Sequence, residues 1–198
     1  SYTDFINQMW YQRSLSIPAE WQGKKILLNF GAVDYFAEIF IDGEFVGNHC
    51  GGSSSFSIDL TRSVKPGQTH NLVVFVIDDI RSGAQAVGKQ SPQVSSFACF
   101  YTRVTGIWQT VWLEPVAAQH IAQLKTTPDI DKKTVKVEVA TNVCSPDKVE
   151  VKVFDGKNLV AKGAALNGVP VELTMPEDVK LWTPESPSLY NMEVTLYK

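Results

Sequence analysis

The sequence predicts an all-β protein made of two β-sandwich domains. Polar and apolar residues alternate with a period of two along many short segments, which is typical of strands with one buried face. Asp-Gly pairs at 42–43 and 155–156 separate such segments, and Asp-Gly is a strong two-residue hairpin signal. We find no convincing helical period. We therefore predict a jelly-roll β-sandwich over residues 1–117, followed by an immunoglobulin-like β-sandwich over residues 118–198.

The composition is that of an ordinary globular chain. Its 198 residues are 44% hydrophobic and 20% charged, with a net charge of −3. Basic residues do not cluster, so we expect no nucleic acid and no membrane surface as a partner. No apolar run approaches the ~20 residues of a membrane span. The spacing of Cys50, Cys99 and Cys144 does not fit a metal site, so we expect no metal and no cofactor, while a single disulfide among them stays open.

Alternation and apolar runs define the strands of the first domain. Residues 25–32 and 71–77 are almost wholly apolar, which is typical of strands buried on both faces. Pro18 ends the first strand, because proline cannot donate to a ladder. The Gly-Ser segment 51–55 lacks the lysine and the following helix of a phosphate-binding loop, so it is interpreted as a flexible connection. The predicted strands are residues 11–17, 25–32, 35–41, 44–48, 56–60, 71–77 and 107–113.

Two features stand out near the end of this domain. Residues 78–97 contain Gly83, Gly88 and Pro92 without periodicity, and long irregular loops in compact domains are usually functional or mobile. The strand at 107–113 carries large apolar residues on both faces, so we expect it between two layers and ended by Pro115.

The second domain shows a stricter alternation. Valines at 135, 137 and 139, for example, alternate with Lys136, Glu138 and Ala140, which predicts one buried and one solvated face. The predicted strands are residues 121–126, 134–141, 148–154, 159–164, 169–175 and 190–196.

Six segments, in order, resemble glycoside hydrolase family 2. Five are similar to its N-terminal sugar-binding domain, and the sixth is similar to the end of its immunoglobulin-like domain. The segments are WQGKKILLNFGAVD (21–34), IDGEFVG (41–47), GGSSSF (51–56), GKQ (88–90), RVTGIWQTVWLE (103–114) and LWTPESPSLY (181–190). The resemblance therefore covers nearly the whole chain.

The resemblance implies a β-galactosidase, a β-glucuronidase, a β-mannosidase or a relative of these. In the family a TIM barrel follows and carries two glutamates, and a retaining mechanism needs such carboxylates about 5–5.5 Å apart. The chain ends before a barrel, so we expect it to have no catalytic residue of its own. We expect a non-catalytic N-terminal fragment of a β-galactosidase-like retaining β-glycosidase that supports the barrel and shapes the substrate entrance.

The expected partners follow from the same resemblance. They are the missing C-terminal TIM barrel, β-linked saccharides and further copies of the full-length parent in a homo-oligomer. A stand-alone carbohydrate-binding module is the alternative, and a purely structural or adhesive pair of sandwiches is the third interpretation. Cysteine usage and the first residues fit a cytoplasmic protein as well as a periplasmic or secreted bacterial one whose leader was removed.

Five residues are candidates for binding substrate or facing the barrel: Arg103, Tyr101, Lys89, Gln90 and Trp108. The guanidinium of Arg103 fits a clamp on sugar hydroxyls or on the barrel, but we favour a structural role. Some family members have an aspartate a few residues before this arginine; Phe100 and Tyr101 stand there here. Lys89 and Gln90 lie in the long loop, which leans toward the barrel in the family.

Structural roles compete for several of these positions. Arg103 would then pair with Asp34 or Asp78 inside the sandwich. Trp108 and Trp112 are better explained by core or interdomain packing than by stacking on a sugar ring, and Trp182 by packing between sandwich edges. Asp78 and Asp79 are adjacent and point to opposite faces, so a capped turn explains them better than calcium or a catalytic pair does.

Overall fold

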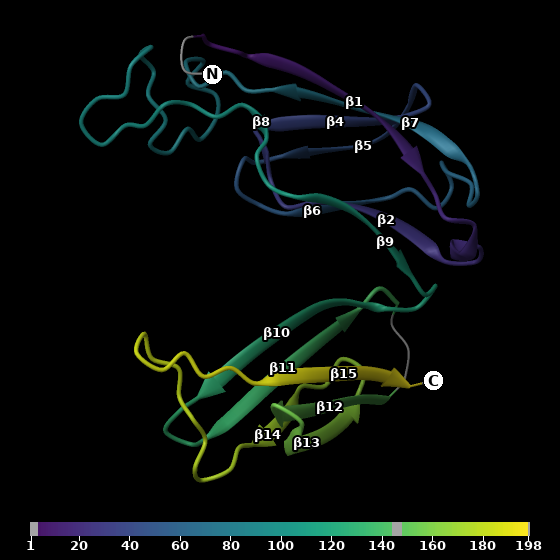
Figure 1. The fold of residues 1–198 in the computed structure, drawn as a ribbon, viewed down its shortest axis with the longest axis vertical. Coiled ribbons are helices and arrows are strands. Elements are labelled where there is room, and N and C mark those ends of the chain that lie inside the picture. The colour runs from purple at the N-terminus through teal and green to yellow at the C-terminus, as the bar shows by residue number, and fades with distance from the viewer. Residues whose placement is uncertain (1–3, 144–147, 198) are drawn as a thin grey trace. The chain divides into compact units, whose positions relative to one another are not determined.

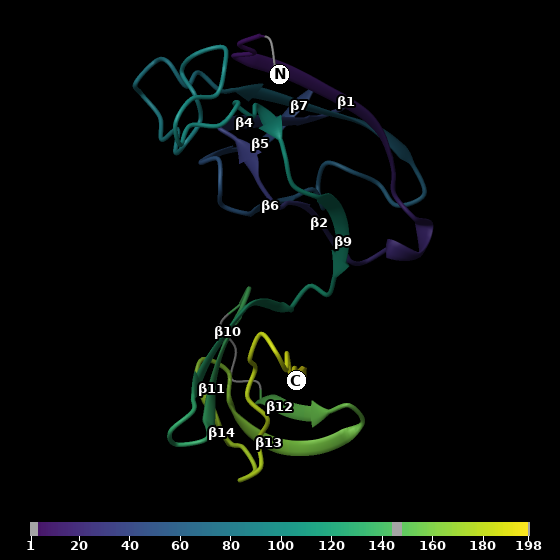
Figure 2. The ribbon, with the colours of Figure 1, turned by 60° about the vertical axis from the view of Figure 1, so that its left-hand side comes forward.

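The computed structural model describes residues 4–143 and 148–197. Contacts between residues divide the chain into two compact units, Ser1–Ala118 and Gln119–Lys198. Every regular element longer than one helical turn in the described ranges is a β-strand, which confirms the all-β prediction. Figures 1 and 2 show the strands of each unit layered as a sandwich. Cys50 and Cys99 are free thiols, and Cys144 lies outside the described residues.

The first unit contains a four-stranded antiparallel sheet facing a three-stranded one. The sheet orders are β1-β7-β4-β5 and β6-β2-β9, and a short β3-β8 pair lies beside them. Side chains such as Phe30, Ile39 and Val76 fill the space between the sheets and are fully buried. The elements are β1 (Gln8–Ser16), the 3-10 turn η1 (Ala19–Trp21), β2 (Lys25–Phe30), β3 (Val33–Asp34), β4 (Phe36–Ile41), β5 (Glu44–Cys50), β6 (Phe56–Asp59), β7 (Thr69–Ile77), β8 (Gly106–Ile107) and β9 (Val111–Val116).

The second unit consists of two three-stranded sheets. Their orders are β10-β11-β14 and β13-β12-β15. The alternating valines of β11 and β12 form the core between them, and Val137 and Val151 are fully buried. The strands are β10 (Ile121–Asp129), β11 (Thr134–Thr141), β12 (Lys148–Asp155), β13 (Asn158–Leu166), β14 (Val171–Thr174) and β15 (Asn191–Tyr197).

The two Asp-Gly turns are confirmed. Asp42 and Gly43 join β4 to β5 and both have positive φ, 52° and 88°, as the tight hairpin requires. Gly156, with φ 61°, lies in the turn between β12 and β13. The conformation that glycine tolerates thus sits where the sequence predicts it.

The predicted strand at 107–113 is wrong as one unbroken strand. β8 ends at Ile107 and pairs with β3, whereas β9 begins at Val111 and pairs with β2. The neighbouring strand is interrupted at the same level, because Gly31 lies between β2 and β3. Gln109 lies against Gly31 so closely that a Cβ on Gly31 would meet its Cβ at 2.7 Å.

Pro115 does not end the strand as predicted, because it lies within β9 opposite Ile26. The amide of Ile26 donates to Thr61 Oγ1 at 3.0 Å, and its carbonyl accepts from Leu60 N at 2.8 Å. Both groups therefore point to the β6 side of β2, away from β9. Pro115 consequently occupies a position where no N–H is needed for the ladder with β2.

Three tryptophans predicted to pack lie at the surface of their own units. Trp108 is 48% exposed and Trp112 44%, so core packing is wrong for these two, whereas interdomain packing stays a prediction. Trp182, predicted to pack between sandwich edges, is 58% exposed. Trp108 belongs to the break between β8 and β9, and Trp112 is on the outer face of β9. Trp182 forms an isolated β-bridge with Pro187.

Candidate functional site

The candidate site is built on one irregular segment, residues 78–105. It leaves the sheet at the end of β7 and returns at β8. Figures 1 and 2 both show this teal segment extending beyond the ends of the strands of the first unit. All of its residues are described, so its anchoring can be followed contact by contact.

Asp34 is the buried anchor of this segment. It ends β3 and is 8% exposed. Its Oδ2 accepts a hydrogen bond of 2.8 Å from Gln90 Nε2, and Gln90 Oε1 accepts one of 2.8 Å from the amide of Val104. A single glutamine therefore ties the outgoing and the returning parts of the segment to the sheet.

Asp78 is a second buried anchor. It directly follows β7 and is 2% exposed. Its Oδ1 accepts from Gln85 Nε2 at 2.6 Å, and its Oδ2 accepts from Thr105 Oγ1 at 2.9 Å. Asp79 caps the next turn, where its Oδ1 accepts from the amide of Arg81 at 3.2 Å. The capped turn that the sequence favoured is the arrangement found.

Burial changes the acid strength of both anchors. Loss of hydration and, to a smaller extent, the charge of Asp78 raise the pKa of Asp34, the bond from Gln90 lowers it, and the net result is a rise from 3.8 to about 6. Burial also raises the pKa of Asp78, while its bonds to Gln85 and Thr105 lower it and the charge of Asp79 raises it. Both carboxyl groups are enclosed, so they serve to hold the segment rather than to meet a ligand.

Arg103 is 5% exposed and connects the segment 78–105 to the N-terminal residues through hydrogen bonds. Its Nη1 donates to the carbonyls of Gln93 at 2.7 Å and Val94 at 3.2 Å, and its Nε donates to the carbonyl of Asp4 at 3.1 Å. The guanidinium also lies 4.2 Å from the centre of the Phe5 ring. This position fits the structural role that we favoured.

The partner predicted for Arg103 is wrong. The ion pairs of the described residues do not join Arg103 to Asp34 or to Asp78. Those carboxylates accept from Gln90, Gln85 and Thr105, whose neutral donors reach them from within the same segment. The guanidinium instead donates to the backbone carbonyls of Asp4, Gln93 and Val94.

Three of the five candidates come together on this segment. The amide of Tyr101 donates to the carbonyl of Lys89 at 2.7 Å, and the amide of Ser91 donates to the carbonyl of Tyr101 at 2.7 Å. Gln90 is half-buried, whereas Lys89 is exposed and Tyr101 is 64% exposed. The segment thus has a fixed inner side and presents Tyr101 outward.

Trp108 joins the same region by another route. Its Nε1 donates to the carbonyl of Gly52 at 2.8 Å. Gly52 in turn lies directly against the carboxylate of Asp34, with no room for a Cβ between them. The sequence missed Asp34 as the centre of the site and took Gly52 for part of a flexible loop. Their positions inside the segments 21–34 and 51–56 were the available signal.

The outer side of the segment carries apolar surface. Phe97 stacks on Phe100 with ring centres 5.1 Å apart and is 39% exposed. Val94 and Val104 are 52% and 47% exposed.

Among the described residues, no group of three or more His, Cys, Asp or Glu side chains is placed to hold a metal ion. No described helix is long and apolar enough to cross a membrane.

Comparison with known families matches both units. The family described as "Glycosyl hydrolases family 2, sugar binding domain" matches residues 3–115, and "Glycosyl hydrolases family 2" matches residues 119–198.

Individual relatives are β-glycosidases by name. The chain is 24% identical to a β-galactosidase of Thermoanaerobacter pseudethanolicus over 98% of its own length and 26% of the relative. It is 28% identical to a putative β-glucuronidase of Formosa agariphila over 94% of its length and 23% of that protein.

Solved structures show the same partial match. A Ruminococcus gnavus β-glucuronidase superposes with a TM-score of 0.75 at 20% identity, over 98% of this chain and 34% of that one. A Faecalibacterium prausnitzii β-glucuronidase gives a TM-score of 0.73 at 26% identity, over 96% and 35%. The chain thus spans about a quarter to a third of the length of these relatives.

Proposed function

This chain belongs to glycosyl hydrolase family 2, and from that premise we propose that it is a non-catalytic portion of a retaining β-glycosidase, which supports the catalytic barrel and shapes its substrate entrance. The names of the relatives, β-galactosidase and β-glucuronidase, support a β-linked galactoside or glucuronide as the substrate.

The carboxylates of the candidate site do not suit the chemical step. A retaining glycosidase needs two carboxyl groups that face the sugar. Asp34 and Asp78 are 8% and 2% exposed and are bonded to side chains of the segment 78–105. On this proposal, the acid/base and the nucleophile come from the barrel.

The observation that carries the proposal is the two-sided construction of segment 78–105. Gln90 and Arg103 fix its inner side, whereas Tyr101 and Phe97 are exposed on its outer side. A loop that is already ordered loses little entropy when another domain or a substrate meets it. This property suits a rim that must hold substrate in one orientation against groups on a second domain.

The experiment is a hydrolysis assay on the complete protein. The substrates are 4-nitrophenyl β-D-glucuronide and 4-nitrophenyl β-D-galactoside. Replacement of Tyr101 by alanine removes an exposed ring, so the fold should be kept while kcat/KM falls about tenfold. The control is Glu44→Ala, at an exposed hairpin of the same unit, which should leave kcat/KM unchanged. An unchanged kcat/KM in Tyr101→Ala contradicts a role of this rim.

A second candidate function is a stand-alone carbohydrate-binding module. Exposed aromatic rings favour it: Trp10 is 63% exposed and stacks on Phe75 at 4.3 Å between ring centres, and Phe45 is 54% exposed. Such rings bind the apolar faces of sugars. Calorimetric titration of the 198-residue chain with galactose, glucuronate, mannose and short β-linked oligosaccharides distinguishes the two. Saturation below about 1 mM indicates a module, and no heat from a folded chain favours the supporting role.

A further inference from the structure

The two facing sheets of the first unit differ in width. One has the order β1-β7-β4-β5 and the other β6-β2-β9. At one side of the sandwich β5 and β6 are in contact. At the other side β1 and β9 are both edge strands. Because one sheet has four strands and the other has three, β1 has no strand opposite it in the narrower sheet.

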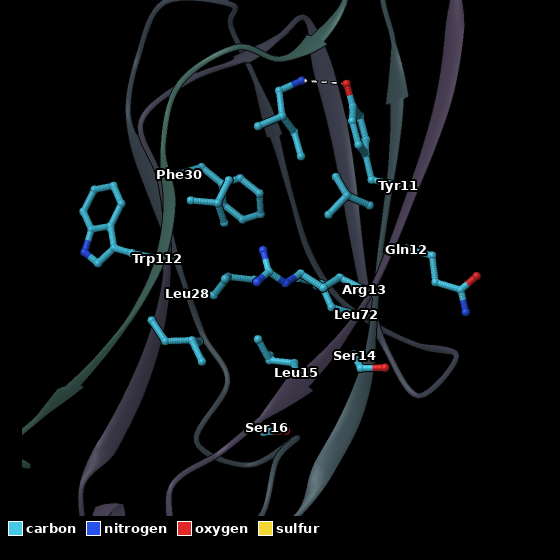
Figure 3. Close-up of a pocket in the computed structure, with 14 residues that line it drawn as sticks. Tyr11, Gln12, Arg13, Ser14, Leu15, Ser16, Leu28, Phe30, Leu72 and Trp112 are labelled. Atoms are coloured by element: carbon cyan, nitrogen blue, oxygen red, sulfur yellow. Dashed lines mark hydrogen bonds between the residues drawn. The ribbon is translucent and has the colours of Figure 1, made fainter.

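An open cavity of about 720 Å³ lies between these two edges. Figure 3 shows its lining side chains between β1 and β9. Its walls are mostly residues of the hydrophobic core or packed on it: Leu15, Leu28, Phe30, Leu72, Val111 and Leu113. The side of the core next to β9 is therefore left open by the chain itself.

Arg13 is the one charged residue among those that line this open cavity, and it is exposed. In Figure 3 the side chain of Arg13 reaches from β1 into the space between the sheets, while Gln12 points away. No aspartate or glutamate is among the residues that line the cavity, all of which are described. A guanidinium forms paired, charge-assisted hydrogen bonds with a carboxylate, which is therefore its favoured partner.

The outer edge of β9 carries backbone groups that are not used by the pairing with β2. Thr110 accepts from Gly31 N at 2.8 Å, so alternate residues from Thr110 onward bond to β2. The amides and carbonyls of Val111 and Leu113 then point to the open edge, as does the carbonyl of Pro115. The same residues, Val111 and Leu113, turn their side chains into the cavity.

We propose that an extended segment of the same protein, supplied from outside these 198 residues, pairs with the free edge of β9 and completes the narrower sheet. Its alternate side chains are apolar and fill the cavity, and one carboxylate meets Arg13. At ~3.3 Å per residue, a strand alongside Val111 to Pro115 is about five residues long and turns two or three side chains inward. The relatives are three to four times longer than the matched region, which supplies ample chain for such a strand.

The test uses a synthetic nine-residue peptide in which threonine alternates with leucine, glutamate, phenylalanine and valine. It is titrated into the ¹⁵N-labelled 198-residue chain. We expect saturable changes in the NMR chemical shifts of the residues that line the cavity, and of no others. Hydrogen exchange should slow at least tenfold at the amides of Val111 and Leu113. The amides of Trp112 and Glu114 serve as internal controls, because they already bond to β2.

Matched peptides separate strand pairing from nonspecific apolar binding. Two peptides are N-methylated, one at the odd and one at the even positions. Only one of these sets of amides faces β9, so one methylated peptide should lose binding and the other should keep it. Replacement of the peptide's glutamate by glutamine should weaken binding about fivefold to the wild type, and not at all to Arg13→Gln. Equal binding of both methylated peptides, or shifts outside the cavity, overturns the proposal.

The complete protein identifies the source of the strand. There, the amides of Val111 and Leu113 should exchange slowly without peptide, and the peptide should not bind. Fast exchange at both amides in the complete protein contradicts the proposal. So does a concentration-dependent dimer of the 198-residue chain, seen by sedimentation, that protects these amides, since the edge then serves a second copy. These readouts do not involve glycoside hydrolysis, so they succeed or fail independently of the proposed activity.

Discussion

Gln90 donates a 2.8 Å hydrogen bond to Asp34, a residue 56 positions earlier in the chain. With its other end the same side-chain amide accepts from Val104 N at 2.8 Å. This one contact connects the sheet of the first unit to both parts of the long segment 78–105.

Replacement of Gln90 by alanine leaves the buried carboxyl group of Asp34 without its donor and the amide of Val104 without its acceptor. We expect the free energy of unfolding of the first unit to fall by about 1–3 kcal/mol. Native-state hydrogen exchange at the core amides of Ile39 and Val76 measures it for this unit alone. Lys89→Ala, at the exposed neighbouring position, is the control and should change it by less than ~0.5 kcal/mol. Equal effects of the two variants contradict the anchor.

Asp34 should make the stability of the first unit depend on pH. Its pKa is about 6 in the folded chain against a usual 3.8, so between these values the folded state binds the extra proton. Stability from this group is therefore fully present below about pH 3.8 and lost as pH rises through 6, by up to ~3 kcal/mol. Asp78, whose pKa is also raised, adds a loss of the same sign.

Asp34→Asn isolates this effect, since asparagine keeps an acceptor for Gln90 and does not ionise. The unfolding free energy of the variant minus that of the wild type should increase from pH 4 to pH 7 and then level off. The same exchange measurement across pH checks it, with the exposed Asp178→Asn as the control for loss of a carboxylate. A difference that stays flat from pH 4 to pH 7 rules out the raised pKa.

Gly52→Ala should destabilise the first unit, because the added Cβ would overlap the buried carboxylate of Asp34. The carboxylate or the backbone must shift, and the Trp108 bond to the carbonyl of Gly52 shifts with it. We expect a loss of about 1–3 kcal/mol. Ser53→Ala, at the next and exposed position, should have little effect. Thermal unfolding of both variants measures the contrast, and a Gly52→Ala variant as stable as Ser53→Ala contradicts the close approach.

Arg103→Lys should loosen the segment without removing its charge. Lysine loses the fork that reaches the carbonyls of Gln93 and Val94 together, and its stacking on Phe5 is weaker. Amide exchange in residues 90–95 should become at least tenfold faster, and the unfolding free energy should fall by about 2 kcal/mol. The exposed Arg62→Lys serves as the control. Unchanged exchange in 90–95 would show that the carbonyl contacts do not order the segment.

Local patterns were sufficient for much of the fold. Alternating valines predicted β11 with its bounds, and Asp42-Gly43 predicted a hairpin, because period and turn chemistry act within a few residues. The break at residues 108–110 could not be predicted in this way, since it depends on Gly31 in the partner strand. Pro115 was misjudged for a related reason, because its tolerance depends on where Ile26 directs its backbone groups.

The candidate site was predicted in part. Irregularity and family resemblance pointed to the long segment 78–97 and to Gln90, but as a residue that binds substrate or faces the barrel; its role as an anchor bonded to Asp34 was not predicted. The partners of Arg103 were not predictable, because side-chain length and charge suggest a carboxylate as readily as three carbonyls. The contact of Asp34 with Gly52 is visible only when two loops distant in sequence are folded together.

The division of this anchor between distant parts of the chain has a consequence for protein engineering. A graft that transfers residues 78–105 from this chain to a relative carries Gln90 but leaves Asp34 and Gly52 behind. The transplanted segment would then keep its outer surface and lose the contacts that hold it to the sheet. Chimeras that exchange this segment therefore need all three positions, Asp34, Gly52 and Gln90, to be moved together.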